Sequence, residues 1–289
     1  MDRVRVGATI ATSFSYIRVA WGRASLAMAF LVGLQALEGI LRLATPQAGR
    51  LLSLAAFIPL IAFGTVVFGA LYRIGVERGG DEEFRLGTGG VQWNGLEWRV
   101  LGANIIAGLI LAVVAIVCLI AWAVALGVSM AGHLDRLEAV SAAVGNVEKL
   151  EAFAQLMMGP AGLATLAVAV PSAVLLLWLN AKLALFSILA ADTRSFDLGK
   201  AWAMTRGATW ALIVTGLVIL AVQLAVGMVF GAVGGAVAGV AGGGGAAAVG
   251  RLFGEVVGAA INTPLTAGMQ IAVYRARRPG GTTVADAFA

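Results

Sequence analysis

Polar side chains that interrupt long apolar runs are the residues of this sequence best placed to do chemistry. Burying such a group among lipid is costly. Polar residues within membrane-spanning helices therefore commonly line a path for an ion or a substrate, or contact a lipid headgroup. Glu38 and Arg42 lie four residues apart in one run, the spacing at which a carboxylate and a guanidinium pair on one helix face. The candidates for contact with a lipid or a substrate are Gln35, Glu38, Asn180, Lys182, Gln223 and Asn262.

Each candidate also has a purely structural interpretation. Lys182 lies about ten residues before Asp192, so its long stem can reach the headgroups or bind a lipid phosphate there. Glu38 lies about 22 Å along a helix from Arg23, which places it near the opposite headgroups. The amides of Asn180, Gln223 and Asn262 equally suit hydrogen bonds between helices.

The sequence gives no catalytic or metal-binding motif. His133 is the single histidine and Cys118 the single cysteine, which excludes a disulfide within the chain and any site with two imidazoles. His133 and Asp135 have the residue types of an acid–base pair. Because they are two residues apart, they would point to different faces of a helix. The GTGG stretch at 87–90 lacks the Lys-Ser/Thr of a phosphate-binding loop and predicts a turn. We therefore expect a protein that is not an enzyme and that holds no cofactor and no metal.

The composition predicts the elements that position these residues. The chain is 60% hydrophobic and 12% charged, whereas soluble domains are about 25% charged. A span needs about 20 mostly apolar residues. The sequence therefore predicts an all-α, polytopic transmembrane bundle forming one integral membrane domain over 1–289. Its predicted spans are approximately 24–44, 51–71, 100–130, 161–190, 208–230 and 252–274.

Basic residues predict the orientation, which also explains the net charge of +5 without a nucleic-acid partner. If the N-terminus is cytoplasmic, few of the 20 Lys and Arg residues lie in the segments on the outer side of the membrane, and Lys182 lies within a span. Those outer residues are Arg42, Arg50, Arg136, Lys149 and Arg251. Both termini are therefore predicted to be cytoplasmic. The excess of Arg over Lys, with abundant Ala and Gly, is typical of a GC-rich bacterial genome and indicates the bacterial inner membrane.

Two half-polar stretches share the pattern F-x-L-G followed, ten residues later, by Trp: 84–98 and 196–210. We predict that each forms a short amphipathic helix in the interface, with Ser195 capping the second. The segment 4–22 fits the same role ahead of the first span. The unit of interfacial helix, span, outer turn and span would then occur three times, either as a transporter-type repeat or as a duplicated hairpin. The predicted interfacial anchors are Trp21, Trp93, Trp98, Trp202 and Trp210.

Two further segments carry expectations. The outer loop 131–160 has apolar residues at helical spacing, which predicts two short amphipathic helices. The segment 231–250 consists mostly of Gly, Ala and Val, and its small residues favour close packing between helices. We predict a helix that frays into a loop at the GGGG of 242–245.

The segment KLALFSILAADTRSFDLGKAWAMTRGATWALIVTGLVIL at 182–220 resembles the bacterial six-span family of YciC-type inner-membrane proteins. The resemblance rests on Lys182, a polar linker, then Ala201, Thr205, Gly207 and Trp210. It implies a six-span membrane fold. The same family supplies the membrane half of some glycerophosphodiester phosphodiesterases, but this chain has no room for their catalytic domain and its paired histidines.

These patterns favour a non-enzymatic integral membrane protein that contacts lipids and works in envelope maintenance or lipid handling. Membrane lipids are the expected partners, with another membrane protein or a homo-oligomer as further candidates. The alternative is a transporter for a lipid or small solute. That alternative requires the polar span residues to share one cavity near mid-membrane. Those residues are Gln35, Glu38, Lys182, Gln223 and Asn262.

Overall fold

A computed structural model describes residues 4–44, 49–76, 81–130, 159–241 and 245–278. Every regular element in these ranges is a helix, which confirms the predicted all-α fold. By packing, the chain divides into two compact units. Unit 1 comprises Met1–Ile105 and Ala181–Ala289, and unit 2 comprises Ile106–Asn180. The predicted single domain over 1–289 stays a prediction.

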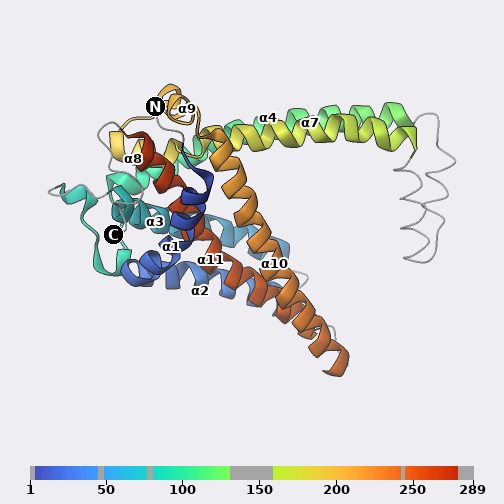
Figure 1. Cartoon of the computed structure of the whole chain (residues 1–289). Helices are drawn as coiled ribbons and strands as arrows, with labels where there is room; N and C mark the ends of the chain where they lie inside the picture. Colours follow the sequence, from blue (N-terminus) through green and yellow to red (C-terminus); the bar gives the residue numbers. More distant parts are fainter. Residues whose placement is uncertain (1–3, 45–48, 77–80, 131–158, 242–244, 279–289) are drawn as a thin grey trace. The chain divides into compact units, whose positions relative to one another are not determined.

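The helices follow one another along the chain as labelled in Figure 1. They are α1 (Val6–Arg23), α2 (Ser25–Ala44), α3 (Gly49–Val76), the 3₁₀ turns η1 (Glu82–Phe84) and η2 (Thr88–Gly90), α4 (Gly95–Met130), α7 (Pro160–Leu183), α8 (Phe186–Thr193), α9 (Leu198–Met204), α10 (Thr209–Ala241) and α11 (Gly245–Arg277).

Six helical stretches in the described residues are long and apolar enough to cross a membrane, as predicted. They are Ser25–Leu43, Ile58–Val76, Thr88–Val128, Gly162–Thr193, Thr209–Val237 and Ala248–Arg277. Helices that are apolar on every side require an apolar surrounding rather than water. The chain is therefore a multi-pass integral membrane protein.

α11 is the central helix of unit 1 and packs against α1, α2, α3 and α10 (Figure 1). Two glycines explain how closely its neighbours approach. A Cβ on Gly268 would lie 2.7 Å from Tyr16 Cβ and 3.0 Å from Ser13 Cα, so α1 crosses α11 there. A Cβ on Gly250 would lie 2.6 Å from Gly234 Cα, so α10 and α11 meet backbone to backbone. The second contact confirms that small residues in 231–250 allow close helix packing.

The span predicted over 161–190 is confirmed by the stretch Gly162–Thr193, but it is not one continuous helix, because a turn at residues 184–185 separates α7 from α8. α8 is buried from Phe186 to Asp192. Tyr72 of α3 bonds Ser187 at 2.9 Å, and the Tyr274 hydroxyl of α11 donates to the Asp192 carboxylate. α8 is thus held between two other helices of unit 1 rather than extending α7.

The interfacial helix predicted over 84–98 is wrong. Residues 81–94 form two 3₁₀ turns joined by extended backbone, and α4 begins only at Gly95. Gly89 and Gly90 have φ of +58° and +81°, which favours glycine and stops a right-handed helix. A Cβ on Gly89 would lie 2.4 Å from Leu26 Cβ, so the turn packs tightly on α2. The turn predicted at GTGG is confirmed.

The second predicted interfacial segment does contain a short helix, α9, but Asp197 caps it instead of Ser195. The Asp197 carboxylate accepts a 2.8 Å bond from the Lys200 backbone N–H. Ala201 and Thr205 are buried whereas Lys200 is exposed, which confirms the predicted two-faced pattern. Whether α9 lies in the interface stays a prediction.

Unit 2 contains the later part of α4 and most of α7. Its large apolar side chains point outward: Val113 and Val117 are each 61% exposed, and Val174 is 60% exposed. Such a surface suits lipid contact. The amphipathic helices predicted within 131–160 fall almost wholly outside the described residues, as do 242–244 of the predicted GGGG loop. The last described residue of α10 is Ala241, and α11 begins at Gly245.

Candidate functional site

The predicted polar residues of unit 1 lie at three separate levels along its helices. At the Ala44 end of α2, the Arg42 guanidinium bonds Glu38 at 2.7 Å, which confirms the predicted pair. It also bonds Glu255 of α11 at 3.2 Å. We call Glu38, Arg42 and Glu255 the acidic triad. With two carboxylates and one guanidinium, its formal charge is −1.

The middle level holds Gln223 of α10 and Asn262 of α11. The Asn262 amide donates to Gln223 Oε1 at 3.4 Å. The space that these two residues line has no room for a water molecule. The pair therefore fits the structural interpretation of a hydrogen bond between helices.

The third level surrounds Lys182, at the last turn of α7 within unit 1. Lys182 is only 7% exposed, and its ammonium lies 5.5 Å from the centre of the Trp202 ring, a cation–π distance. Arg206 is close enough to act on Lys182 electrostatically. Sequence reasoning identified Lys182 but missed Arg206, because no spacing rule links a helix end to a turn two elements later.

Arg277 completes this group at the end of α11. Gly207 has φ of +76°, which turns the chain between α9 and α10, and its missing side chain leaves room for Arg277. A Cβ on Gly207 would lie 2.7 Å from Arg277 Nη2. The buried Arg277 Nε has no hydrogen-bond partner among the described residues. We call Lys182, Arg206 and Arg277 the basic cluster.

The acids nearest to the basic cluster in sequence are occupied elsewhere. Asp192 accepts the Tyr274 hydroxyl and lies 3.7 Å from Arg278, whereas Asp197 caps α9. Within the described ranges, no carboxylate pairs with Arg206 or Arg277. Like charges at short range repel, and an anionic group beside them would relieve that repulsion.

The polar span residues do not share a level. Gln223 is 14 residues beyond the start of α10 at Thr209, which corresponds to about 21 Å along the helix. The basic cluster therefore lies far from the Gln223–Asn262 pair, and the acidic triad lies beyond that pair. Gln35 is half-buried on α2 and Asn180 is exposed in unit 2.

A buried ion pair in unit 1 was missed by sequence reasoning. Arg73 and Glu97 have fully buried side chains and form two bonds, of which Nη2 to Oε2 is 2.8 Å. Glu97 also accepts the Asn94 N–H at 2.9 Å, while Asn94 Oδ1 accepts the Leu96 N–H. This is a capping box at the start of α4. The Asn-x-x-Glu spacing before an apolar run was the available signal.

Trp21, predicted as an interfacial anchor, has a specific partner in α11. Its indole N–H donates to the Ala260 carbonyl at 3.1 Å. Pro264 lies four residues later within the same helix and has no N–H to donate to that carbonyl. Trp21 thus supplies the hydrogen bond that the proline removes.

We expect Trp21→Phe to lower the free energy of unfolding by about 1 kcal/mol, because it leaves a partly buried carbonyl without its hydrogen bond. Unfolding in mixed detergent micelles measures this. In a Pro264→Ala background, the new backbone N–H at position 264 can bond Ala260, so Trp21→Phe should cost clearly less. An equal cost in both backgrounds would show that the Trp21 bond does not replace the one that Pro264 removes.

The other predicted anchors differ in exposure. Trp98 is 61% exposed and Trp210 is 69% exposed, each within the first turn of a span. Trp93 packs edge-on against Trp98, with ring centres 5.2 Å apart. Trp202 lies under Lys182 and is partly buried. Exposed indoles at span ends fit the headgroup region, although the anchor role itself stays a prediction.

The described ranges contain no group of three His, Cys, Asp or Glu residues placed to hold a metal ion. Comparison of the chain with protein-family models, with curated proteins and with solved structures finds no match.

Proposed function

We propose that this chain is a non-enzymatic membrane protein that binds anionic phospholipid through the basic cluster. The proposal is carried by three basic residues from separate elements near the turn at Gly207. Arg277 lies against Gly207, and Arg206, the residue before it, is close enough to act on Lys182 electrostatically. A phosphodiester headgroup offers a negative charge and hydrogen-bond acceptors to Arg206 and Arg277, with which no carboxylate of the described residues pairs. Basic pockets between membrane helices commonly bind such headgroups.

The depth of the cluster supports a lipid as the source of the anion. Lys182 ends α7, Arg277 ends α11, and Arg206 precedes α10 by a few residues. Arg206 and Arg277 therefore lie where spans begin or end, at the level of headgroups, whereas Lys182 lies inside the span Gly162–Thr193 and joins them through its long side chain. Trp202 beneath Lys182 adds an apolar surface beside the charge, which suits an amphiphilic ligand.

We expect neutralising substitutions in the basic cluster to remove the preference for anionic lipid. Each basic residue near an anionic headgroup contributes about 1 kcal/mol, or roughly fivefold in affinity. Lys182→Ala, Arg206→Ala and Arg277→Ala should each reduce the enrichment of anionic phospholipid over bulk by about that factor. Lipid mass spectrometry on protein extracted into native nanodiscs provides the measurement.

Lys200→Ala is the matched control, because Lys200 is an exposed cation on the opposite face of α9. It should leave the lipid profile unchanged, and Lys182→Arg should preserve the enrichment. A wild-type profile equal to the bulk membrane, or equal losses in Lys200→Ala and Lys182→Ala, would refute a specific headgroup site.

The cellular setting is part of the proposal. We infer that the side with the basic cluster faces the cytoplasm of a bacterium, with both termini there, because basic residues concentrate on the cytoplasmic side. The resemblance of 182–220 to the YciC-type family supports the same membrane and a role in envelope maintenance or lipid handling. The transporter alternative finds no support in the separate levels of the polar residues of unit 1.

A further inference from the structure

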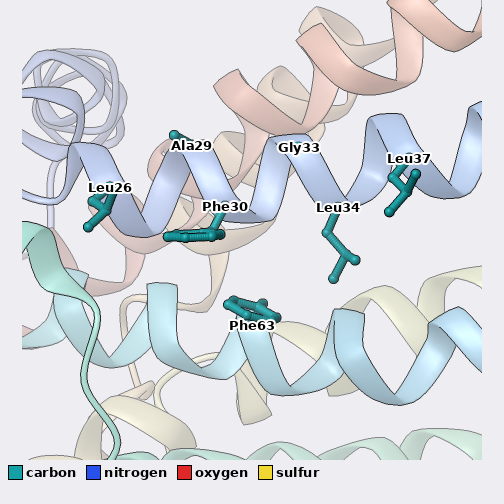
Figure 2. A pocket seen from close by; sticks show the side chains of 7 residues that line it. All are labelled: Leu26, Ala29, Phe30, Gly33, Leu34, Leu37 and Phe63. Carbon is teal, nitrogen blue, oxygen red and sulfur yellow. The ribbon is translucent and has the colours of Figure 1, made fainter.

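An apolar groove runs between α2 and α3 in unit 1 (Figure 2). Its volume is about 450 Å³, and its described lining consists of apolar side chains and one glycine. Phe30 of α2 stacks on Phe63 of α3 with ring centres 5.8 Å apart, so an aromatic pair connects the two walls. Leu26 and Leu37 mark the ends of the groove along α2 and are 44% and 51% exposed. The groove is therefore open to the medium beside the helices.

The medium beside the groove is the hydrocarbon of the bilayer. α2 and α3 supply two of the six stretches that are long and apolar enough to cross a membrane. At the Leu26 end, the η2 turn lies across both helices, because a Cβ on Gly90 would lie 3.1 Å from the Cβ atoms of Ala24 and Ala70. The turn covers that end, so the groove is reached sideways from the lipid.

The groove lies in the leaflet on the side of the basic cluster. Leu26 is in the first turn of the span Ser25–Leu43, and Leu34 is the middle residue of that span. Most of the groove therefore lies in the half of the membrane where α2 begins. Because η2 joins the start of α2 to the later part of α3, α3 ends in that half too. Gly75 near that end packs against Ile271 of α11, and the basic cluster lies at the same end of α11.

We propose that this groove seats one acyl chain of a phospholipid from that leaflet, and that it holds the chain without regard to the headgroup. An empty apolar groove would deprive its walls of dispersion contacts, so a hydrocarbon occupant is favoured. The described lining has no charged or polar side chain that could select a headgroup. The site is separate from the basic cluster, and the proposal does not rest on the function proposed there.

The dimensions of the groove fit one chain. Leu26 and Leu37 are eleven residues apart, about 16 Å along a helix, and the hydrocarbon of one leaflet is about 15 Å deep. The volume divided by that length gives a mean cross-section of about 28 Å², equal to a circle roughly 6 Å across. Carbon atoms in contact are about 4 Å apart, so a row of methylene groups fits. A helix with its side chains is about 10–12 Å across and is too wide to enter.

The test is photo-crosslinking of the full chain in nanodiscs of phosphatidylcholine. A small fraction of that lipid carries a diazirine at the middle of one acyl chain, and the labelled residues are mapped by peptide mass spectrometry. The reference is Leu217 of α10, which is 44% exposed. Leu217 is eight residues past the start of α10, as Gly33 is past the start of α2, so the two residues lie at similar depths.

We expect residues 30–34 of α2 to carry roughly fivefold more label per residue than Leu217, because a seated chain gains about ten carbon contacts that a flat helix face does not offer. Gly33→Leu fills the groove without a clash, since a Cβ on Gly33 meets nothing within 4 Å. It should reduce the label on this segment to the level of Leu217. Gly227→Leu on α10, where a Cβ also meets nothing within 4 Å, is the matched control and should leave the label unchanged.

Two further results separate the groove from the basic cluster. The same diazirine chain on phosphatidylglycerol should label the groove equally, and Arg277→Ala should leave that label unchanged. Equal label at residues 30–34 and at Leu217 would indicate ordinary boundary lipid and overturn the proposal. A groove label that appears only with phosphatidylglycerol would also overturn it. A dimer that Gly33→Leu dissociates would overturn it as well, because the groove would then belong to a second copy of the chain.

Discussion

Glu97→Ala is expected to lower the free energy of unfolding by about 3–5 kcal/mol, because it leaves Arg73 as an uncompensated charge in the interior. Both side chains are fully buried in unit 1, so bulk water does not solvate the guanidinium. The substitution also removes the acceptor of the Asn94 N–H and so weakens the first turn of α4. Equilibrium unfolding in mixed detergent micelles measures the loss.

Two companion variants separate the buried charge from a general effect of substitution. Arg194→Gln breaks two pairs, with Asp81 and Glu83, in which the arginine is 51% exposed, and such pairs contribute about 0–1 kcal/mol each. Replacing both buried partners, with Arg73→Met and Glu97→Leu together, removes the charge and should be less destabilising than Glu97→Ala alone. If the double variant is as unstable as the single one, the unpaired charge is not the cause.

Gly268→Leu is expected to displace α1 from α11, since the new side chain would meet Ser13 backbone atoms at 3.0 and 3.2 Å. Backbone cannot move aside as a flexible side chain can. Overpacking of this kind costs about 1–3 kcal/mol or more. The packing of α1 on α11, which buries Tyr16 and Ser13, is therefore weakened by that free energy.

Maleimide labelling of a cysteine at position 13, introduced as Ser13→Cys with Cys118→Ala, reports this displacement. Ser13 is fully buried, so labelling requires α1 to move away. A loss of about 1–3 kcal/mol in the free energy that holds α1 against α11 raises the labelling rate by roughly 5- to 150-fold. Gly22→Leu, on α1 where a Cβ meets nothing within 4 Å, should not change the rate. An equal increase in both variants would contradict the close crossing at Gly268.

The sequence predicted the features that depend on local composition. Runs of apolar residues specify spans through their length, because each span must satisfy its own backbone within lipid. The Glu38–Arg42 pair followed from helical spacing, and the turn at 87–90 followed from its glycines. Each of these features is determined by the residues of its own segment.

The sequence did not predict features that depend on contacts between distant segments. The break between α7 and α8 has no proline or glycine to mark it in the run from Leu183 to Ala191. Its cause lies in α3 and α11, whose tyrosines hold Ser187 and Asp192. Likewise, Gly207 and Arg277 are remote in sequence, and they lie together only because Gly207 turns the chain beside the end of α11.

The F-x-L-G pattern at 84–87 and 196–199 led to the prediction of the same structure in both segments, and the two segments differ for a physical reason. Phe84 is buried, whereas Phe196 is 50% exposed. The first copy continues into Thr-Gly-Gly, which adopts positive φ values, while the second continues into helix-forming Lys and Ala. Similar letters before a span therefore produced a packed turn in one case and a helix in the other.

The position of α11 has a consequence for how the protein is made. α11 packs against α1, α2, α3 and α10, yet it follows all four in the chain. During synthesis, those helices enter the membrane before their common neighbour exists. The Ala260 carbonyl, the Tyr274 hydroxyl and Gly268 all arrive with α11 and give Trp21, Asp192 and Tyr16 their partners. Unit 1 can therefore complete its packing only after α11 has been inserted.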